Sequence, residues 1–248
     1  MRLEDKVCIV TGAGRNLGQD YAVRLGKEGA KVVVCDVLDC AETAEMVKAA
    51  GAEVLALQVD VTSEEQTIEL ARRTVEEFGR IDCLLNNAGL MRNLGPTSLM
   101  ELDLDMWDRV FAVNVKGSLL CTRAVFPYMK EQGDGKIINV SSGTWLHTSR
   151  TAGSSNSHYV SSKAAVMALT RSVARELGQY NIKVNTLAPG STEVGLGPDQ
   201  DPQDDADRAL GRRGRSDDLT GAVVFLFSED SDFVTGQMLL VNGGMEVY

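Results

Sequence analysis

Val7-Cys-Ile-Val-Thr-Gly-Ala-Gly-Arg-Asn-Leu-Gly18 is the most informative segment of this 248-residue chain. It passes from a short apolar run into a glycine-rich turn and then into a helical pattern. Glycine permits a tight turn and a close approach of the backbone to a ligand, and the free amides at a helix N-terminus attract phosphate. Because the turn directly follows a first strand, the segment predicts a binding site for the pyrophosphate of a dinucleotide.

The rest of the chain alternates between short apolar runs and helical patterns. Six further runs rich in Val, Ile and Leu predict strands at Lys31 to Cys35, Glu53 to Val59, Ile81 to Leu85, Lys136 to Val140, Ile182 to Leu187 and Met238 to Val241. The intervening patterns predict helices at Gly18 to Glu28, Ala41 to Ala50, Glu64 to Phe78, Asp105 to Lys130, Tyr159 to Leu177 and Leu219 to Phe227. This alternation predicts an α/β fold, with a doubly wound, mostly parallel sheet of seven strands and helices on both faces.

Length and composition indicate one domain and limit the partners. A chain of 248 residues with no internal repeat or linker fits a single domain spanning residues 1–248. The net charge of -10 argues against nucleic acid or an anionic membrane as partner, because both select for clustered Lys and Arg. A small-molecule substrate is therefore expected.

The cysteines and the start of the chain indicate a cytoplasmic protein. The five cysteines are scattered without CxxC spacing, which is typical of reduced and mostly buried thiols, with Cys40 the candidate for exposure. The first residues lead straight into an apolar run of six residues, too short for a signal peptide or a membrane span. No His, Cys and Asp group has metal-ligand spacing, so no catalytic metal is expected.

Asp36 favours NAD over NADP as the dinucleotide. It closes the second predicted strand, eighteen residues after Gly18, where a carboxylate can accept hydrogen bonds from the adenosine ribose hydroxyls and repel a 2′-phosphate. Arg15 is the counter-evidence, because it could face such a phosphate. We weigh it below Asp36, so NAD is expected and NADP is the less favoured cofactor.

Tyr159 and Lys163 form the candidate reacting pair. Residues four apart share one face of a helix, and an ammonium held close to a phenol lowers the pKa of the phenol. A tyrosine tuned in this way can act as a general acid or base. Ser141 and Ser142 end the preceding strand, where neighbours face opposite ways, and we favour Ser142 as the one that points into the site.

Several ordered motifs together resemble those of the short-chain dehydrogenase/reductase family, in its compact single-domain form. Residues 11–18 resemble the TGxxxGxG turn, residues 60–61 the adenine-side pair, residues 86–89 the NNAG motif, and residues 241–244 a typical ending of the family. Asn114, Ser142, Tyr159 and Lys163 match its catalytic positions, and the resemblance spans essentially the whole chain.

This resemblance implies a Rossmann-like, NAD(P)-dependent enzyme that acts on CH–OH donors, and it assigns roles to residues. Tyr159 is implied to be the acid/base, Lys163 to lower its pKa and bind the nicotinamide ribose, Ser142 to orient the substrate oxygen, and Asn114 to hold a water behind Lys163. A homotetramer is also implied. The expected cofactor contacts are Gly12, Arg15, Asn16, Leu17, Gly18, Asp36, Asp60, Val61, Asn87, Ala88, Gly89, Tyr159, Lys163, Pro189, Gly190 and Thr192.

The chain departs from the family pattern in two of its cofactor motifs. Asn16 stands where glycine is usual, and asparagine tolerates left-handed backbone. Val194 replaces the usual threonine after Pro189-Gly190, which leaves Thr192 as our choice for the carboxamide contact.

Two long loops, residues 143–158 and 190–215, are expected to border the substrate. The first is longer than usual in the family and brings Trp145, Leu146 and His147 into the candidate pocket, with Leu90 and Met91. His147 and His158 could be extra proton carriers, but we expect them to be ordinary surface or turn histidines. The second loop is acidic, and we expect Val194 to Ala209 to be mobile without ligands.

The function indicated by these residues is an NAD-dependent oxidoreductase that interconverts a secondary alcohol and a ketone by hydride transfer, with Tyr159 as acid/base. A 3-oxoacyl-carrier-protein reductase is the alternative within the enzyme class, for which Arg212, Arg213 and Arg215 would form the docking patch. A non-catalytic NAD-binding protein is the alternative outside it, although such a protein has no need for the intact Ser, Tyr and Lys set.

Overall fold

Seven parallel strands form one sheet, in the order β3-β2-β1-β4-β5-β6-β7. The computed structural model describes residues 1–91, 94, 98–146, 156–193 and 208–246. The strands are β1 (Val7–Thr11), β2 (Lys31–Asp36), β3 (Val54–Gln58), β4 (Cys83–Asn86), β5 (Gly135–Val140), β6 (Ile182–Pro189) and β7 (Met238–Val241). The predicted doubly wound, Rossmann-like sheet is confirmed. Strand order reverses between β1 and β4, the point at which such sheets bind ligands.

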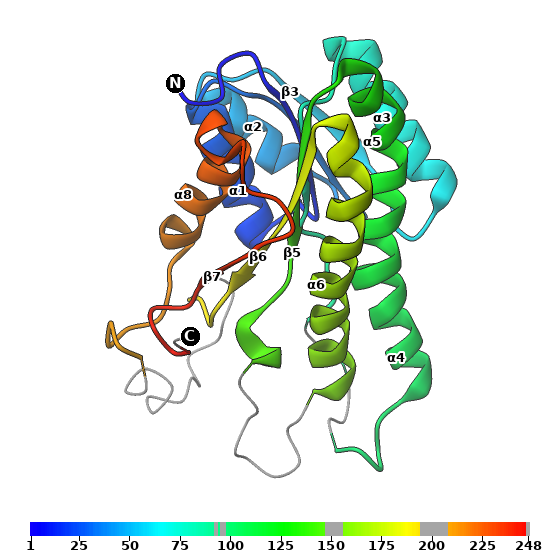
Figure 1. Ribbon diagram of the computed structural model, residues 1–248, viewed down its shortest axis with the longest axis vertical. Coiled ribbons are helices and arrows are strands. Elements are labelled where there is room, and N and C mark those ends of the chain that lie inside the picture. Colours follow the sequence, from blue (N-terminus) through cyan, green and yellow to red (C-terminus); the bar gives the residue numbers. More distant parts are fainter. Residues whose placement is uncertain (92–93, 95–97, 147–155, 194–207, 247–248) are drawn as a thin grey trace.

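Helices cover both faces of the sheet (Figure 1). They are α1 (Asn16–Lys27), α2 (Ala41–Ala49), α3 (Glu64–Phe78), α4 (Leu104–Phe111), α5 (Ser118–Gln132), α6 (Ser157–Leu177) and α8 (Ser216–Phe227). Figure 1 shows α1, α2 and α8 on one side and α3, α5 and α6 on the other. Each side has its own apolar core: Tyr21, Leu25 and Phe227 belong to the first, and Leu70 and Met129 to the second.

The burial of each strand follows its apolar pattern. All residues of β1, β5 and β6 are buried, as expected of strands covered on both faces. The edge strand β3 has partly exposed positions. Full burial of a Val, Leu or Ile side chain contributes about 1.5–3 kcal/mol, so the central strands anchor the fold and hold their carboxyl ends in fixed positions.

The helix expected from Asp105 to Lys130 is interrupted. It begins with α4 at Leu104, passes through a π-helical turn at Ala112–Gly117, and continues as α5. The turn ends at a glycine that packs tightly, because a Cβ on Gly117 would lie 2.8 Å from Val61 Cγ2. No periodicity in the sequence predicts this turn, and it carries Asn114.

The cysteines are free and buried, and one expectation about them was wrong. Cys40 is only 3% exposed and packs in the core beneath the start of α2, where it contacts apolar side chains rather than solvent. In the part of the chain that the structure describes, no helix is both long and apolar enough to cross a membrane.

Candidate active site

The expected site residues gather where β1, β4, β5 and β6 end. Thr11 ends β1, Asn86 ends β4, and Ser142 follows β5 by two residues. The carboxyl ends of parallel strands meet at one edge of a sheet, beside the reversal in strand order. The site is therefore built on buried strands, with α1 and α6 supplying residues from their N-terminal turns.

The glycine turn packs directly against the end of β4. Gly12 has a φ of +65°, and a Cβ there would lie 2.6 Å from Ala88 Cα. A Cβ on Gly18 would lie 2.1 Å from the Gly12 carbonyl oxygen. Only glycine fits at both places, so the expected role of these two residues in shaping the turn has a steric basis.

Thr11 locks the turn to the neighbouring strand, a role that the sequence reasoning missed. Its Oγ1 accepts hydrogen bonds from the backbone amides of Asn87 (3.1 Å) and Ala88 (3.0 Å). The Asn87 side chain donates to the carbonyls of Thr11 and Gly12, both at 3.0 Å. Asn87 and Ala88 thus support the turn, and a threonine at a strand end was the available signal.

The N-terminus of α1 is open to an anion. Arg15 is its N-cap, with extended backbone and no side-chain capping bond, and its first turn holds no acidic residue. By contrast, α3 is capped by Ser63 and carries two glutamates in its first turn. Asn16 adopts the left-handed backbone (φ +57°) that we expected of it. Uncapped amides and the helix dipole suit a phosphate group.

Asp36 lies at the end of β2 and contacts the glycine turn. Its Oδ2 accepts from the Gly14 amide and its Oδ1 from the Leu38 amide, both at 3.0 Å. Farther along the same edge, Asp60 Oδ1 accepts from the amide (2.9 Å) and hydroxyl (2.7 Å) of Thr62. Backbone amides thus hold the Asp36 carboxylate at the end of β2 and the Asp60 carboxylate just after β3.

Ser142 and Tyr159, the expected substrate anchor and acid/base, lie next to each other in the candidate site. The hydroxyl of Tyr159 is hydrogen-bonded to Ser142, whose Oγ also accepts from the Thr144 hydroxyl at 3.1 Å. Ser141 points the other way and donates to the Lys163 carbonyl at 2.6 Å. This arrangement agrees with our choice of Ser142 over Ser141. Both reacting side chains are over 90% buried.

Lys163 lies beneath the Tyr159 ring and is directed at the strand. Its Nζ donates to the Val140 carbonyl at 2.8 Å and lies 5.7 Å from the centroid of the Tyr159 ring. Burial lowers the pKa of Lys163 to about 8, because the charged form loses its hydration.

The expectation that Lys163 lowers the pKa of Tyr159 was wrong for this arrangement. Burial raises the pKa of Tyr159, and the hydrogen bond with Ser142 only partly opposes that change. The physical reason is that the lysine ammonium bonds the strand carbonyl rather than the phenol oxygen. Tyr159 is therefore protonated at neutral pH.

Asn114 connects α6, which carries Tyr159 and Lys163, to the segment that follows β4. Its Oδ1 accepts from the Leu90 amide (2.7 Å), and its Nδ2 donates to Ser162 Oγ (2.9 Å). A Cβ on Gly89 would lie 3.3 Å from Asn114 Oδ1 and 3.4 Å from Lys163 Nζ. The structure thus brings together Asn114, Lys163 and Gly89, and it adds Ser162, which the sequence reasoning missed.

The residues after β6 border the candidate site on its remaining side. Gly190 packs against the C-terminal segment, because a Cβ there would lie 2.8 Å from Asn242 Cα. Thr192 is partly buried and pairs with Gly214 in an isolated parallel bridge. Residues 194–207, which include Val194, lie outside the described residues. Arg208, at the far end of the same loop, is buried and donates to the Ser191 carbonyl at 3.1 Å.

Two histidines had been expected at the surface or in turns. His147 lies outside the described residues, whereas His158 is fully buried, so that expectation was wrong for His158. It packs inside the first turn of α6, directly before Tyr159. Trp145 and Leu146 are half-buried in and after the short 3₁₀ turn Gly143–Trp145.

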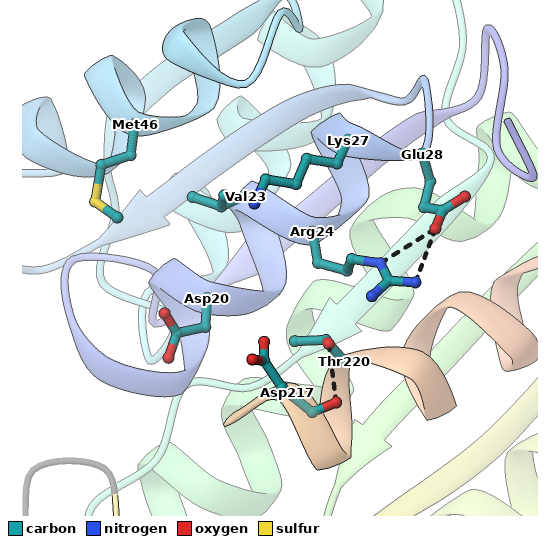
Figure 2. Close-up of a pocket in the computed structure, with 8 residues that line it drawn as sticks. All are labelled: Asp20, Val23, Arg24, Lys27, Glu28, Met46, Asp217 and Thr220. Carbon is teal, nitrogen blue, oxygen red and sulfur yellow. Dashed lines mark hydrogen bonds and ion pairs between the residues drawn. The ribbon is translucent and has the colours of Figure 1, made fainter. Parts of the chain in front are cut away.

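A separate hollow of about 390 Å³ lies between α1, α2 and α8 (Figure 2). No expected site residue lines it. Two of its charged side chains already have partners: Arg24 donates to Glu28 at 2.9 Å, and Asp20 is hydrogen-bonded to Ser216. The hollow therefore represents the packing of three helices rather than an extension of the candidate site.

Comparison with known proteins shows the family of this chain. A family model described as enoyl-(acyl carrier protein) reductase matches residues 12–246. The chain is 36% identical to the (2S)-[(R)-hydroxy(phenyl)methyl]succinyl-CoA dehydrogenase subunit BbsD of Thauera aromatica, covering 100% of this chain and 99% of that protein. It is 35% identical to the 3-oxoacyl-[acyl-carrier-protein] reductase FabG of Thermotoga maritima, covering 100% of both.

Solved structures give the same result. An NAD+-bound xylitol dehydrogenase superposes with a TM-score of 0.89 at 32% identity, covering 98% of this chain and 100% of that one. Levodione reductase superposes with a TM-score of 0.88 at 32% identity over the full length of both chains. The chain belongs to the short-chain dehydrogenase/reductase family. It is an NAD(P)-dependent oxidoreductase that acts on CH–OH or keto groups.

Proposed function

We propose that this enzyme interconverts a secondary alcohol and a ketone with NAD, using Tyr159 as the general acid/base. The observation that carries the proposal is the hydrogen-bonded pair of Ser142 and Tyr159, buried above Lys163 at the sheet edge. When bound, the nicotinamide supplies the centre that exchanges hydride with the substrate carbon. The chain must then supply a proton to the substrate oxygen or remove one.

The residues of the pair divide this task. Ser142 is a hydroxyl that can hold the substrate oxygen beside Tyr159. A Tyr159 pKa raised by burial keeps the phenol protonated at neutral pH, which is the state required to protonate a ketone oxygen. In the opposite direction the proton must leave, so oxidation is expected to become faster as pH rises. Lys163 has a lowered pKa, and its Nζ lies 5.7 Å from the centroid of the Tyr159 ring, so in its neutral form it is our candidate to pass the proton on.

The cofactor position is supported by the open helix and by Asp36. The uncapped α1 amides suit the pyrophosphate, and the carboxylate of Asp36 stands beside that turn. A fixed negative charge there favours ribose hydroxyls over a 2′-phosphate. Arg15 is exposed at the N-cap of the same helix, so it lies near enough to interact with a phosphate if the carboxylate is neutralised.

Asp36→Asn should therefore shift the cofactor preference. The amide keeps an acceptor oxygen for the turn but removes the charge that repels the 2′-phosphate. We expect the ratio of kcat/KM for NADP to that for NAD to rise at least about tenfold, which corresponds to about 1.4 kcal/mol. Steady-state kinetics with both cofactors measures the ratio.

Asp39→Asn is the matched control, because it removes the same charge three residues later from a carboxylate that bonds the Ala41 amide instead. Its ratio should stay within twofold of the original. Equal ratios in the Asp36 variant and in the unchanged protein would contradict the role of Asp36.

A panel of alcohols tests the reaction itself. We would titrate NADH by fluorescence and then measure NAD reduction with 1-phenylethanol, cyclohexanol and xylitol, which represent aryl, alicyclic and sugar alcohols. Binding of NADH with turnover of at least one alcohol supports the proposal. Binding without any turnover would contradict it.

The full-length similarity to a 3-oxoacyl-carrier-protein reductase keeps a second candidate function, so the panel also includes a 3-hydroxyacyl thioester and NADPH. The expected docking patch is a weak basis for that function. Arg212 makes two hydrogen bonds to the Asp218 carboxylate, at 2.7 and 2.9 Å, and Arg213 is buried. Arg215 lies 3.4 Å from the Glu193 carboxylate. These contacts neutralise most of the basic cluster.

A homotetramer is the proposed assembly, and five buried free thiols support the expected cytoplasmic location. Exposed apolar side chains on one chain, such as Phe233 and Leu104, are consistent with burial against further copies. Size-exclusion chromatography with light scattering should give four times the chain mass of 26.8 kDa. A mass equal to one chain at micromolar concentration would contradict this assembly.

A further inference from the structure

His158 is a buried titratable side chain that the proposed reaction does not use. It is 0% exposed and precedes Tyr159 directly in the first turn of α6. The backbone amide of Tyr159 donates to its Nδ1 at 2.9 Å, and its Nε2 lies 3.3 Å from the Leu94 carbonyl oxygen. A ring nitrogen that accepts from an amide carries no proton, so the proton resides on Nε2 and is donated to Leu94.

The start of α6 explains why an imidazole is needed there. The first amides of a helix have no intrahelical partner and require a cap. The N-cap residue, Asn156, has left-handed backbone (φ +43°) and makes no side-chain capping bond. Nδ1 of His158 satisfies the amide of Tyr159 from within the helix. The imidazole therefore takes over part of the capping at the residue on which the reaction depends.

The other ring nitrogen connects this cap to the segment between β4 and α4. Leu94 is 6% exposed and belongs to a small apolar cluster with Val110 and Tyr159. Leu94 is thus linked to Tyr159 in two ways: its side chain belongs to the apolar cluster of the tyrosine ring, and its carbonyl binds the imidazole that accepts from the Tyr159 amide. Both links hold Tyr159 to the segment between β4 and α4.

We propose that His158 is a positioning residue for Tyr159, acting as a neutral bridge between the Leu94 carbonyl and the start of α6. This inference rests on the proposed role of Tyr159 as acid/base. The bridge requires one tautomer, with the proton on Nε2 and none on Nδ1. Misplacement of a reacting group by about 1 Å can cost on the order of a hundredfold in rate, so the bridge should be visible in kcat.

A first experiment reads the bridge without any substrate. The chain has only two histidines, so ¹⁵N NMR of histidine-labelled protein, with a His147→Gln variant for assignment, isolates the His158 signals. At pH 7.5 we expect a single tautomer with the proton on Nε2. A proton on Nδ1, or signals averaged between both tautomers, would overturn the bridge. This result does not depend on whether Tyr159 is catalytic.

A second experiment separates the two links by substitution. His158→Asn keeps an acceptor within reach of the Tyr159 amide, His158→Gln keeps a donor within reach of the Leu94 carbonyl, and His158→Leu removes both. With the best alcohol of the panel, kcat should fall about a hundredfold in the Leu variant and about tenfold in each of the others. The dissociation constant of NADH, measured by fluorescence, should stay within twofold in all three.

These outcomes distinguish the bridge from a general loss of structure and from failure of the proposed function. A kcat within threefold of the original in the Leu variant, or equal losses in all three variants, would overturn the inference. Should the Leu variant not fold, the comparison of the Asn and Gln variants with the unchanged protein retains the test. No turnover of any alcohol by the unchanged protein would contradict the proposed function alone, and the NMR result would still decide the bridge.

Discussion

Tyr159→Phe should lower kcat at least about a hundredfold, the lower end of the range for general acid/base catalysis. The substitution removes only the hydroxyl that is bonded to Ser142 and leaves the ring in its apolar cluster with Leu94 and Val110. The cofactor turn and the α1 N-terminus are unchanged, so NADH should bind with a dissociation constant within about threefold of the original. Stopped-flow turnover and fluorescence titration measure the two quantities.

Tyr21→Phe provides the matched control for this substitution. Tyr21 is also fully buried, but it lies in the core beneath α1, and its hydroxyl is a buried atom for which the described structure shows no hydrogen-bond partner. Removal of that hydroxyl should leave kcat within twofold. Near-normal turnover in Tyr159→Phe, or an equal loss in both variants, would contradict Tyr159 as the acid/base.

Lys163→Met should abolish most of the turnover and yet stabilise the protein at neutral pH. The pKa of Lys163 is lowered from 10.5 to about 8, so its charge opposes folding by up to about 3 kcal/mol. Loss of the hydrogen bond to the Val140 carbonyl offsets about 1 kcal/mol. A net gain of about 2 kcal/mol in the free energy of unfolding at pH 7 follows, measured by urea denaturation at fixed protein concentration.

The pH dependence of this gain has a defined sign. Between about pH 8 and 10.5 the unfolded chain binds a proton at Lys163 that the native protein does not, so the original protein becomes relatively more stable as pH rises. The advantage of the Met variant should therefore shrink above pH 8 and disappear near pH 10.5. Lys48→Met, at an exposed lysine paired with Glu45, should change stability by less than about 1 kcal/mol at either pH. A constant advantage across this range would contradict the lowered pKa of Lys163.

The architecture was predictable because its signals are local, and so was the gathering of the candidate site residues at one edge of the sheet. Apolar runs of four to seven residues between helical patterns indicate buried parallel strands, and the glycine turn identifies β1. The left-handed backbone of Asn16 and the opposite directions of Ser141 and Ser142 also follow from local stereochemistry. Strand ends then bring distant residues to one edge by topology alone.

The remaining features depend on contacts between segments far apart in the sequence. The direction of the Lys163 ammonium is decided by the Val140 carbonyl of β5, and the burial of His158 by a segment more than sixty residues earlier. Helical spacing shows that Lys163 and Tyr159 share a face, but it does not show which acceptor the lysine selects. For the same reason, sequence spacing alone assigned the wrong direction to the pKa of Tyr159.

The position of Asn114 depends on the number of residues in the π-helical turn at Ala112–Gly117. Such a turn holds more residues per turn than an α-helix, and π turns of this kind occur frequently at functional sites. A substitution at position 114 changes the chemistry of the residue, whereas an insertion or a deletion in the turn changes the direction in which the residue points. A one-residue deletion that made the helix regular would rotate α4 relative to α5 by about 100°. The helix that carries Asn114 is therefore constrained against changes in length more strongly than against changes in composition.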